Sequence, residues 1–289
     1  MDIVLQRNGL RLVLMPDLGG SVRTFACNGR NLLFPAADAP ATPLETAAFP
    51  LFPFSGRIRD GRFAWNGRQV QLAPNFPPEP HAIHGQAWQA GWQVDSLGPD
   101  SVRLSYRHRP DRWPWAYNAV QTFDLLDNGL QLRLDLQNLS DEAMPAGLGW
   151  HPYFPREGAS LSANVSAVWT AESSMIPNRK SPLGPDTDLS AARPVRGLRL
   201  DNAFAASPAD AEIAWQPGGP TVSIRSSPEL THLVVFVPEG ERFFCVEPVS
   251  HAPDAVNADA GPEVTGLRSL APGETLTARI VLRIGEEAG

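Results

Sequence analysis

The chain of 289 residues contains a single lysine, Lys180, among its 24 basic residues. A mechanism that needs a Schiff-base lysine is therefore nearly excluded. The sequence also lacks a run of about eighteen apolar residues, and no charged-then-apolar segment opens it, so neither a membrane span nor a secretory leader is predicted. The net charge of −7 argues against nucleic acid or an anionic membrane surface as the main partner. We expect a soluble, cytoplasmic protein.

Cysteine is also scarce. Cys27 and Cys245 are too few and too far apart in the chain for a disulfide framework or a zinc knuckle. Hydrophobic residues make up 43% of the chain, which is enough to bury a large core. Because no linker-like segment divides the sequence, residues 1–289 are expected to form one domain. Monomer and homodimer both remain open.

The sequence also contains no long stretch in which apolar residues recur with the period of a helix. The 29 prolines and 24 glycines interrupt the chain too often for long helices. Asn-Gly pairs begin at Asn8, Asn28, Asn66 and Asn128, each between strand-like runs. Asn-Gly favours the type I′ turn of a two-residue hairpin, because both residues tolerate positive φ. The predicted fold class is therefore all-β, a large antiparallel β-sandwich.

Alternating patterns locate the strands. Between residues 130 and 136 leucines alternate with polar residues, as in a half-buried strand. Strands are expected in the ranges 2–7, 10–15, 21–27, 32–35, 62–65, 68–72, 92–97, 102–107, 117–126, 130–138, 161–169, 212–216, 221–225, 232–237, 242–247 and 276–284. The longest irregular stretches are 35–53 and 178–199, and long loops in compact domains tend to line or cover sites.

One histidine lies in the aromatic segment Gly-Leu-Gly-Trp-His-Pro-Tyr-Phe-Pro at residues 147–155. Pro152 restricts His151 to an extended backbone. Alternate side chains of an extended segment share a face, so His151 and Tyr153 are predicted to point one way and Trp150 the other. A titratable group walled by rings suits a ligand with apolar faces and hydroxyl edges, such as a sugar. The alternative is a core histidine among core aromatics.

A glutamate that is also followed by a proline and preceded by aromatic residues lies in the segment Arg-Phe-Phe-Cys-Val-Glu-Pro-Val-Ser at residues 242–250. Alternation places Phe243, Cys245 and Glu247 on one face, and Pro248 keeps Glu247 extended. Burial there would raise the pKa of the glutamate toward the range useful to a general base. A buried glutamate without a role is costly, which favours a functional interpretation.

Three further segments carry polar residues suited to a ligand. Arg57 offers a planar fork of donors that can hold a carboxylate or two vicinal hydroxyls, although a solvated arginine is the alternative. His84, followed by Gly85, allows a close approach to a ligand, and Trp88 can stack on it. Asp201 lies in a short polar break that is predicted to be a loop.

These segments together resemble the aldose 1-epimerase (galactose mutarotase) family over essentially the whole chain. The most specific matches are Gly-Trp-His-Pro-Tyr-Phe at 149–154 and Val-Glu-Pro-Val-Ser at 246–250. The resemblance implies a β-supersandwich fold. It also implies a cofactor-independent isomerase that interconverts the α- and β-anomers of a hexose, with a small-molecule sugar as its partner.

The resemblance also implies roles for individual residues. Glu247 would be the base that takes the proton from the anomeric hydroxyl, and His151 the acid that protonates the ring oxygen. His84 would hydrogen-bond the sugar, Arg57 would bind and orient it, and Asp201 would contact its hydroxyls.

Departures from the family pattern bear on the sugar preference. The family often has Asn-Arg-Ile where this chain has Gly-Arg-Ile at 56–58, and His-Gly-Gly where it has His-Gly-Gln at 84–86. A branch of the same superfamily acts on hexose 6-phosphates and holds the phosphate with arginines. Arg59, Arg156 or Arg179 could serve there, but no clustered basic motif follows residues 84–86, so a neutral sugar is expected.

The residue types fit this reaction without the resemblance. Opening the ring removes a proton at O1 and delivers one at O5, and closing reverses both roles. One carboxylate and one imidazole can do this without a cofactor or a metal. The most useful test of this mechanism is whether the two groups face each other across one cleft at the separation of a sugar ring. Ring faces for the sugar are expected from Trp88, Trp150, Tyr153 and Phe204.

Two other classes of protein share some of these residues. A non-catalytic carbohydrate-binding sandwich would use the aromatics and Arg57 but has no need of an acid and a base. A metal enzyme of cupin type would use His81, His84, His151 and Glu247 as ligands. The His-x-x-His spacing of the first two is a weak metal signal in a loop.

Overall fold

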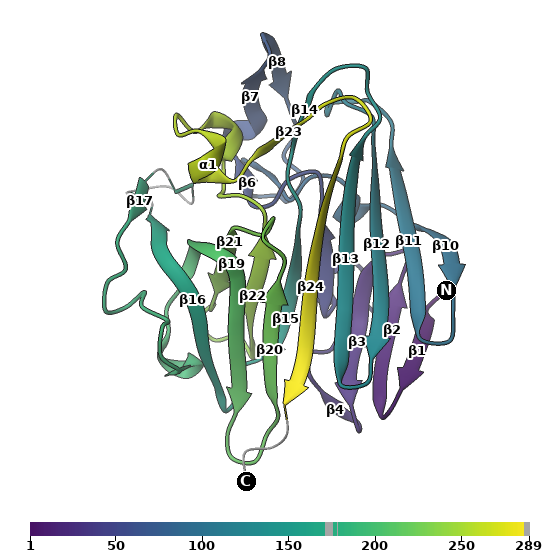
Figure 1. The fold of residues 1–289 in the computed structure, drawn as a ribbon, viewed down its shortest axis with the longest axis vertical. Helices are drawn as coiled ribbons and strands as arrows, with labels where there is room; N and C mark the ends of the chain where they lie inside the picture. The colour runs from purple at the N-terminus through teal and green to yellow at the C-terminus, as the bar shows by residue number, and fades with distance from the viewer. Residues whose placement is uncertain (171–175, 178, 286–289) are drawn as a thin grey trace.

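The computed structural model describes residues 1–170, 176–177 and 179–285. Named strands pair antiparallel, and eighteen of them form a large curled sheet that folds over into two layers (Figure 1). This confirms the all-β sandwich predicted from the turns. In the described part of the chain the one α-helix is α1 (Pro262–Thr265), and no helix is long and apolar enough to cross a membrane.

The first layer contains the strands that cover one side of the core. Their order is β10 (Gln93–Leu97), β11 (Ser101–His108), β12 (Tyr117–Leu126), β13 (Gly129–Asn138), β24 (Thr275–Gly285) and β20 (Thr221–Ser226). The four alternating leucines of β13 are all buried, as their pattern predicts. β20 then pairs with the second half of β19 (Asp201–Trp215).

The second layer carries the site. Its order is β1 (Ile3–Arg7), β2 (Leu10–Met15), β3 (Ser21–Cys27), β5 (Ala48–Leu51), β15 (Gly149–Pro155), β22 (Phe243–Val249) and β21 (His232–Phe236). β21 pairs with the first half of β19, so this long strand joins the two layers. Figure 1 shows β24, β13 and β12 in front of β3, β2 and β1.

Shorter elements complete the fold. β16 (Ala159–Thr170) pairs with β19 and with the short strands β17 (Arg179–Ser181) and β18 (Arg193–Pro194). The other short strands are β4 (Arg30–Asn31), β6 (Arg57–Ile58) with β9 (Ala82–Ile83), β7 (Arg62–Trp65) with β8 (Arg68–Gln71), and β14 (Met144–Ala146) with β23 (Arg268–Leu270). Short 3₁₀ turns lie at Pro43–Glu45, Arg59–Gly61, Ala87–Gln89, Val195–Gly197 and Ala255–Asn257.

Three of the four Asn-Gly pairs form the predicted hairpin turn. Both residues of each pair have positive φ, and they are the two loop residues between β1 and β2, β3 and β4, and β7 and β8. At Asn128 the prediction is wrong, because the loop residues are Asp127 and Asn128 and Gly129 already belongs to β13. A Cβ at Gly129 would lie 2.0 Å from the carbonyl oxygen of Leu282, so close approach of β24 requires the glycine there.

Several strands lie in segments predicted to be irregular, and β17 and β18 fall within the 178–199 stretch. β5 falls within the 35–53 stretch, where Ala-Phe-Pro-Leu shows no alternation because all four residues are buried. β19 begins at Asp201, so the polar break at 200–204 is largely a strand rather than a loop. Residue 178, at the start of the other long irregular stretch, lies outside the described residues.

The strands β15 and β22 separate two apolar clusters. Trp150, Phe154 and Phe244 belong to the main core between the layers. Phe49, Tyr153 and Cys245 belong to a smaller cluster on the opposite face. Because side chains alternate along a strand, the same two strands support the core and present a second, outer face on which the site lies.

Candidate active site

A cavity of about 390 Å³ opens on this outer face of the second layer. Its walls come from β15, β21 and β22 and from segments near residues 56–57, 83–88 and 201–203. All six residues predicted for catalysis or sugar binding line it, namely Arg57, His84, Trp88, His151, Asp201 and Glu247. Segments far apart in the sequence therefore meet in one cavity.

The register of β15 and β22 places the two predicted catalytic residues opposite each other. Gly149 pairs with Val249 and Tyr153 with Cys245, so His151 lies directly across from Glu247 on the same face. His151 and Tyr153 line the cavity whereas Trp150 is in the main core, as the alternation predicts.

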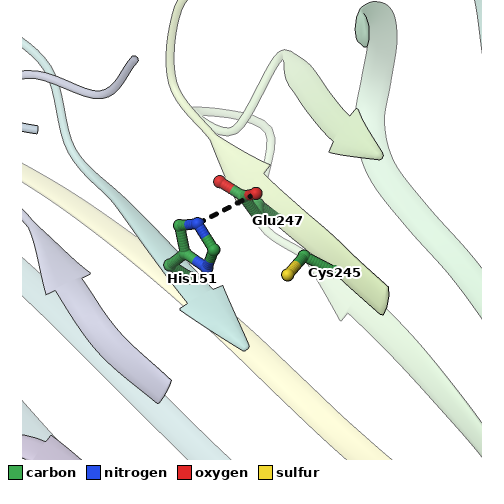
Figure 2. Close-up of side chains that lie close together, drawn as sticks. All are labelled: His151, Cys245 and Glu247. Carbon is green, nitrogen blue, oxygen red and sulfur yellow. Dashed lines mark ion pairs between the residues drawn. The ribbon is translucent and has the colours of Figure 1, made fainter. Parts of the chain in front are cut away.

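The two side chains are in direct contact. Figure 2 shows the imidazole of His151 turned toward the carboxyl of Glu247, with Nε2 and Oε1 3.3 Å apart. The two groups are therefore closer to each other than the width of a sugar ring. O1 and O5 of a pyranose are bonded to the same carbon, so two groups that serve both oxygens have to lie side by side.

Burial controls the electrostatics of this pair. Glu247 is 3% exposed and His151 is 8% exposed. Burial raises the pKa of Glu247 well above its usual value, and the nearby Asp201 raises it further while Arg57 opposes the shift. Burial lowers the pKa of His151 to about 3. Both shifts favour an uncharged pair with one transferable proton.

Aromatic packing fixes the imidazole of His151. Phe49 on the neighbouring strand β5 stacks against it with ring centroids 4.6 Å apart, and Tyr153 stacks at 4.8 Å. The ring of His84 meets it edge-on at 5.5 Å. The imidazole is therefore oriented mainly by ring contacts, and Nε2 is the atom that faces Glu247.

His84 has a defined tautomer. Its Nδ1 accepts a hydrogen bond from the backbone N–H of Gly56 at 3.1 Å, so the proton of the neutral ring is on Nε2. Burial lowers the pKa of His84 well below its usual value, and His151 and Arg57 lower it further. A neutral His84 with a free Nε2–H is a hydrogen-bond donor in the cavity wall.

The glycine after His84 has a role other than the predicted one. A Cβ at Gly85 would lie 1.9 Å from the carbonyl oxygen of Phe52. Gly85 does not line the cavity, so the close approach is to the protein backbone and not to the cavity. Trp88 does line it, but this ring is 2% exposed and stacks on Phe49 at 5.4 Å.

Arg57 and Asp201 lie at the more open side. The guanidinium of Arg57 pairs with Glu79, Nη2 to Oε2 at 3.3 Å, while its buried Nε has no hydrogen-bond partner among the described residues. Asp201, the first residue of β19, is exposed and lines the cavity. This side thus offers a guanidinium and a carboxylate to a ligand.

A family model described as aldose 1-epimerase matches residues 1–283. The chain belongs to the aldose 1-epimerase family. It is 31% identical over 293 residues to the uncharacterized protein YphB of Escherichia coli (strain K12), covering 98% of this chain and 99% of YphB. The family resemblance seen in the sequence is thereby confirmed.

Solved structures show the same fold. A galactose mutarotase-like protein from Clostridium acetobutylicum superposes with a TM-score of 0.92 at 20% identity, covering 99% of this chain and 95% of that chain. Galactose 1-epimerase from Lactobacillus acidophilus NCFM gives a TM-score of 0.80 at 16% identity, covering 99% and 94%. At these identities the likeness is one of fold.

The cavity contains only some of the predicted ring faces. Trp88 and Tyr153 line the cavity, but Trp150 and Phe204 are in the main core, so the prediction is wrong for these two. Trp150 precedes His151 in a strand and must point the opposite way. Phe243 was correctly placed on the face of Glu247, and it too lines the cavity.

Other lining residues were not predicted. Val234 and Phe236 share a face of β21, but residues 233–237 are all apolar, so no alternation in the sequence marked them. Glu79, the partner of Arg57, lies in a proline-rich segment without any pattern that marks it. Its part in the site depends on tertiary contacts alone.

The two departures from the family pattern have different consequences. Gly56 lines the cavity with a φ of 65°, and a Cβ there would lie 3.3 Å from the Cβ of Pro253. Gln86 does not line it, and its Oε1 accepts a hydrogen bond from the hydroxyl of Tyr117 at 3.3 Å. Of the two, the glycine therefore changes the shape of the cavity.

The ligand set of a cupin-type metal enzyme is not assembled. Nδ1 of His81 accepts a hydrogen bond from the backbone N–H of Asp60 at 3.0 Å, and His81 does not line the cavity. A different group, His151, Cys245 and Glu247, has possible ligand atoms within 4.8 Å of one another (Figure 2). The same contact between His151 and Glu247 also suits proton exchange without a metal.

Proposed function

We propose that this protein is a cofactor-independent aldose 1-epimerase that interconverts the α- and β-anomers of an uncharged hexose. The observation that carries the proposal is the buried contact of 3.3 Å between Nε2 of His151 and Oε1 of Glu247 in the wall of a sugar-sized cavity. Membership of the aldose 1-epimerase family supports the same reaction.

The reaction needs one proton removed and one delivered at neighbouring atoms. Loss of the O1 proton and protonation of O5 break the C1–O5 bond and open the ring. Rotation about C1–C2 presents the other face of the carbonyl, and the reverse transfers close the ring as the other anomer. Glu247 as base and His151 as acid supply both transfers, each contributing roughly 10²–10⁴-fold.

The protonation state of the pair suits this exchange. A protonated carboxyl with a neutral imidazole has the same number of protons as a carboxylate with an imidazolium. The first form is favoured, since burial raises the pKa of Glu247 and lowers that of His151. Moving one proton across the contact produces the second form, so both roles are available without a proton from solvent.

The remaining walls suit sugar hydroxyls. The Nε2–H of His84 and the guanidinium of Arg57 are donors, while Asp201 is an acceptor. Trp88 and Tyr153 present apolar ring surface to the C–H face of a pyranose. Donors, an acceptor and ring faces in one cavity are the features that a monosaccharide site needs.

A hexose 6-phosphate is the second candidate, and the charges do not favour it. Within the described part of the chain the one arginine that lines the cavity is Arg57, which already pairs with Glu79. Arg59 pairs with Asp254, and Arg156 donates to the carbonyl oxygen of Pro238. A dianionic phosphate would therefore meet few free cations, so a neutral sugar is proposed.

A non-catalytic sugar-binding sandwich remains the alternative outside enzymes. The cost of the buried pair argues against it. Burying a carboxyl and an imidazole costs stability unless their partners compensate, and sugar binding alone does not need them. The pair is explained by proton transfer.

Polarimetry tests the proposal directly. Freshly dissolved α-D-glucose and α-D-galactose should lose excess optical rotation faster with the protein than in buffer, and Glu247→Gln should abolish most of the difference. No catalysis on any free hexose would contradict the enzyme assignment. A strong preference for glucose 6-phosphate would replace the neutral sugar with the second candidate.

A further inference from the structure

The thiol of Cys245 has no part in the proposed reaction, although it lies beside the reacting pair. Cys245 and Glu247 alternate along β22, so their side chains share a face, and Cys245 pairs with Tyr153 on β15. Cys245 is fully buried and does not line the cavity. Figure 2 shows its sulfur on the side of β22 where His151 lies. The thiol is therefore next to the two proton-exchanging groups without reaching the cavity.

These three side chains place their polar atoms at the separations of a metal site. A ring nitrogen of His151, a carboxyl oxygen of Glu247 and the sulfur of Cys245 all lie within 4.8 Å of one another. Two nitrogen or oxygen ligands arranged tetrahedrally around zinc, each at about 2.0–2.2 Å, are about 3.4 Å apart. Nε2 of His151 and Oε1 of Glu247 are 3.3 Å apart. This pair therefore already has the separation that zinc requires, and the sulfur has to move by about 1 Å at most to reach its own.

The types of ligand favour zinc over harder divalent cations. Imidazole, thiolate and carboxylate are the three kinds of side chain that bind zinc in proteins, whereas Mg²⁺ and Ca²⁺ prefer oxygen ligands alone. Carboxylate and thiolate together bring two negative charges, which offset the charge of a divalent ion in this buried setting. The carboxyl of Glu247 and the thiol of Cys245 each release their proton to solvent when the ion binds.

The fourth coordination position faces the cavity. His84 does not fill it, because its Nδ1 accepts the N–H of Gly56 and its Nε2 carries the ring proton, which leaves no lone pair for an ion. The cavity of about 390 Å³, which His151 and Glu247 line, can supply a water molecule instead. Three protein ligands and one open position are typical of zinc sites that exchange their fourth ligand. An ion can therefore enter and leave through the cavity.

We propose that His151, Cys245 and Glu247 form a zinc site whose occupancy reversibly switches the epimerase off. The inhibition rests on the proposed function, whereas the binding of the metal does not. In the zinc-loaded protein Nε2 of His151 and the carboxylate of Glu247 are both bonded to the ion. Neither group can then remove the proton at O1 or deliver one at O5, so the sugar ring stays closed.

Polarimetry with added zinc tests the inhibition. The hexose that the protein epimerises fastest is followed with metal-free protein, then with rising zinc chloride, then after excess EDTA, each beside a protein-free blank. Saturating zinc should lower kcat at least roughly 10²-fold, because both proton-transfer groups are lost, and EDTA should restore it. Magnesium chloride at the same concentrations should have no effect. A rate that zinc leaves unchanged or raises overturns the proposal.

Substitution of Cys245 separates this site from a general effect of zinc. Cys245→Ala leaves His151 and Glu247 in place, so kcat without zinc should stay within about two-fold, while the zinc concentration for half-inhibition rises at least about ten-fold. Cys245→Ser has the same expectation and serves if the alanine variant does not fold. Cys27→Ala removes the other cysteine of the chain, on β3, and is the matched control that should keep the sensitivity of the parent. Equal sensitivity of the parent and the Cys245 variants overturns the site.

Cobalt reports on the ligands without any need for activity. Co²⁺ replaces Zn²⁺ in such sites, and a thiolate ligand gives it a charge-transfer absorption band in the near ultraviolet. The parent and Cys27→Ala should show this band on titration with cobalt chloride, and Cys245→Ala should lack it. If the parent shows no band, the metal site is overturned whether or not the protein is an epimerase. If the band depends on Cys245 but the parent epimerises no hexose, the metal site is supported and the proposed function alone fails.

Discussion

The two sides of the cavity are built in different ways. His151 and Glu247 lie on β15 and β22, adjacent strands in the middle of the second layer with paired neighbours on both sides. Arg57 and His84 belong to the two-residue pair β6–β9 and the turn after it. The hydrogen bond from Gly56 and ring contacts with Phe49, Trp88 and His151 orient His84, and the ion pair with Glu79 orients Arg57.

This difference suggests that the two sides of the cavity have different roles. Groups that exchange protons must keep their separation within a few tenths of an ångström, and a hydrogen-bonded ladder supplies that rigidity. Groups that recognise hydroxyls can lie on shorter segments, whose sequence changes without disturbing the sheet. We therefore expect changes on the strand side to affect kcat and changes on the loop side to affect KM.

The largest effect is expected at Glu247. Glu247→Gln removes the proton-exchanging group but matches the shape of the protonated carboxyl that burial favours, so the fold should persist. We expect kcat to fall roughly 10²–10⁴-fold, while binding followed by tryptophan fluorescence weakens far less. Near-normal kcat in this variant would show that the base is another group.

A double substitution tests whether His151 and Glu247 act together. His151→Asn should also lower kcat roughly 10²-fold or more, and combining it with Glu247→Gln should cost less than the product of the single effects. Both groups act on one transition state, so either change alone disables most of the exchange. Strictly multiplicative effects would indicate two independent roles.

A pH-dependent change in the free energy of unfolding is expected from a residue that lies where the two sides of the cavity meet. His251 follows β22, its Nε2 accepts the backbone N–H of Ser55, and its Nδ1 contacts the carbonyl oxygen of Ala252. Burial lowers the pKa of His251 to about 4, opposed by the contact with Ala252. The neutral ring therefore holds the segment before Arg57 against the strand side.

The lowered pKa of His251 determines how the contribution of this residue to stability changes with pH. Below pH about 6.5 the unfolded chain binds a proton that the folded chain excludes, so this stability is complete above pH 6.5 and is lost as pH falls toward 4. The loss reaches about 3 kcal/mol, roughly 1.4 kcal/mol per pH unit. The free energy of unfolding, measured in urea at pH 7, 6 and 5, should have a shallower slope against pH for His251→Gln than for the parent. An unchanged slope would assign the pH dependence to other groups.

A smaller effect is expected on the loop side. Arg57→Ala removes the guanidinium from the cavity wall and should raise KM about ten-fold with a lesser effect on kcat, since a hydrogen bond from a charged donor contributes about 1.5–3 kcal/mol. Glu79→Gln keeps the guanidinium and is the matched control, expected to change KM less. A large fall in kcat with unchanged KM for Arg57→Ala would contradict the division between the two sides.

The smallest effect is expected from metal removal. Proton exchange between an imidazole and a carboxyl needs no Lewis acid, so dialysis against a chelator should leave the rate of epimerisation within about two-fold. Elemental analysis should then find no stoichiometric metal. Activity that is lost on chelation and restored by zinc would assign His151, Cys245 and Glu247 as ligands instead.

Much of the site could be predicted because short-range rules act on it. Proline after His151 and after Glu247 predicts extended backbone, and alternation predicts which neighbours share their face. The same rule placed Trp150 on the opposite face, so assigning it as a ring face for the sugar was an error of function rather than of structure. Phe204 was misassigned because its segment was predicted to be a loop, whereas in β19 it faces the core.

The sequence by itself determined the strand class, three type I′ hairpins and the faces of β15 and β22, since these depend on neighbours within a few residues. Tertiary structure alone decided that β5 completes the second layer, that Glu79 pairs with Arg57, and that Leu282 requires a glycine at 129. It also decided the 3.3 Å contact between His151 and Glu247. Residues nearly a hundred positions apart meet only through strand register, which is set by packing of the whole sheet.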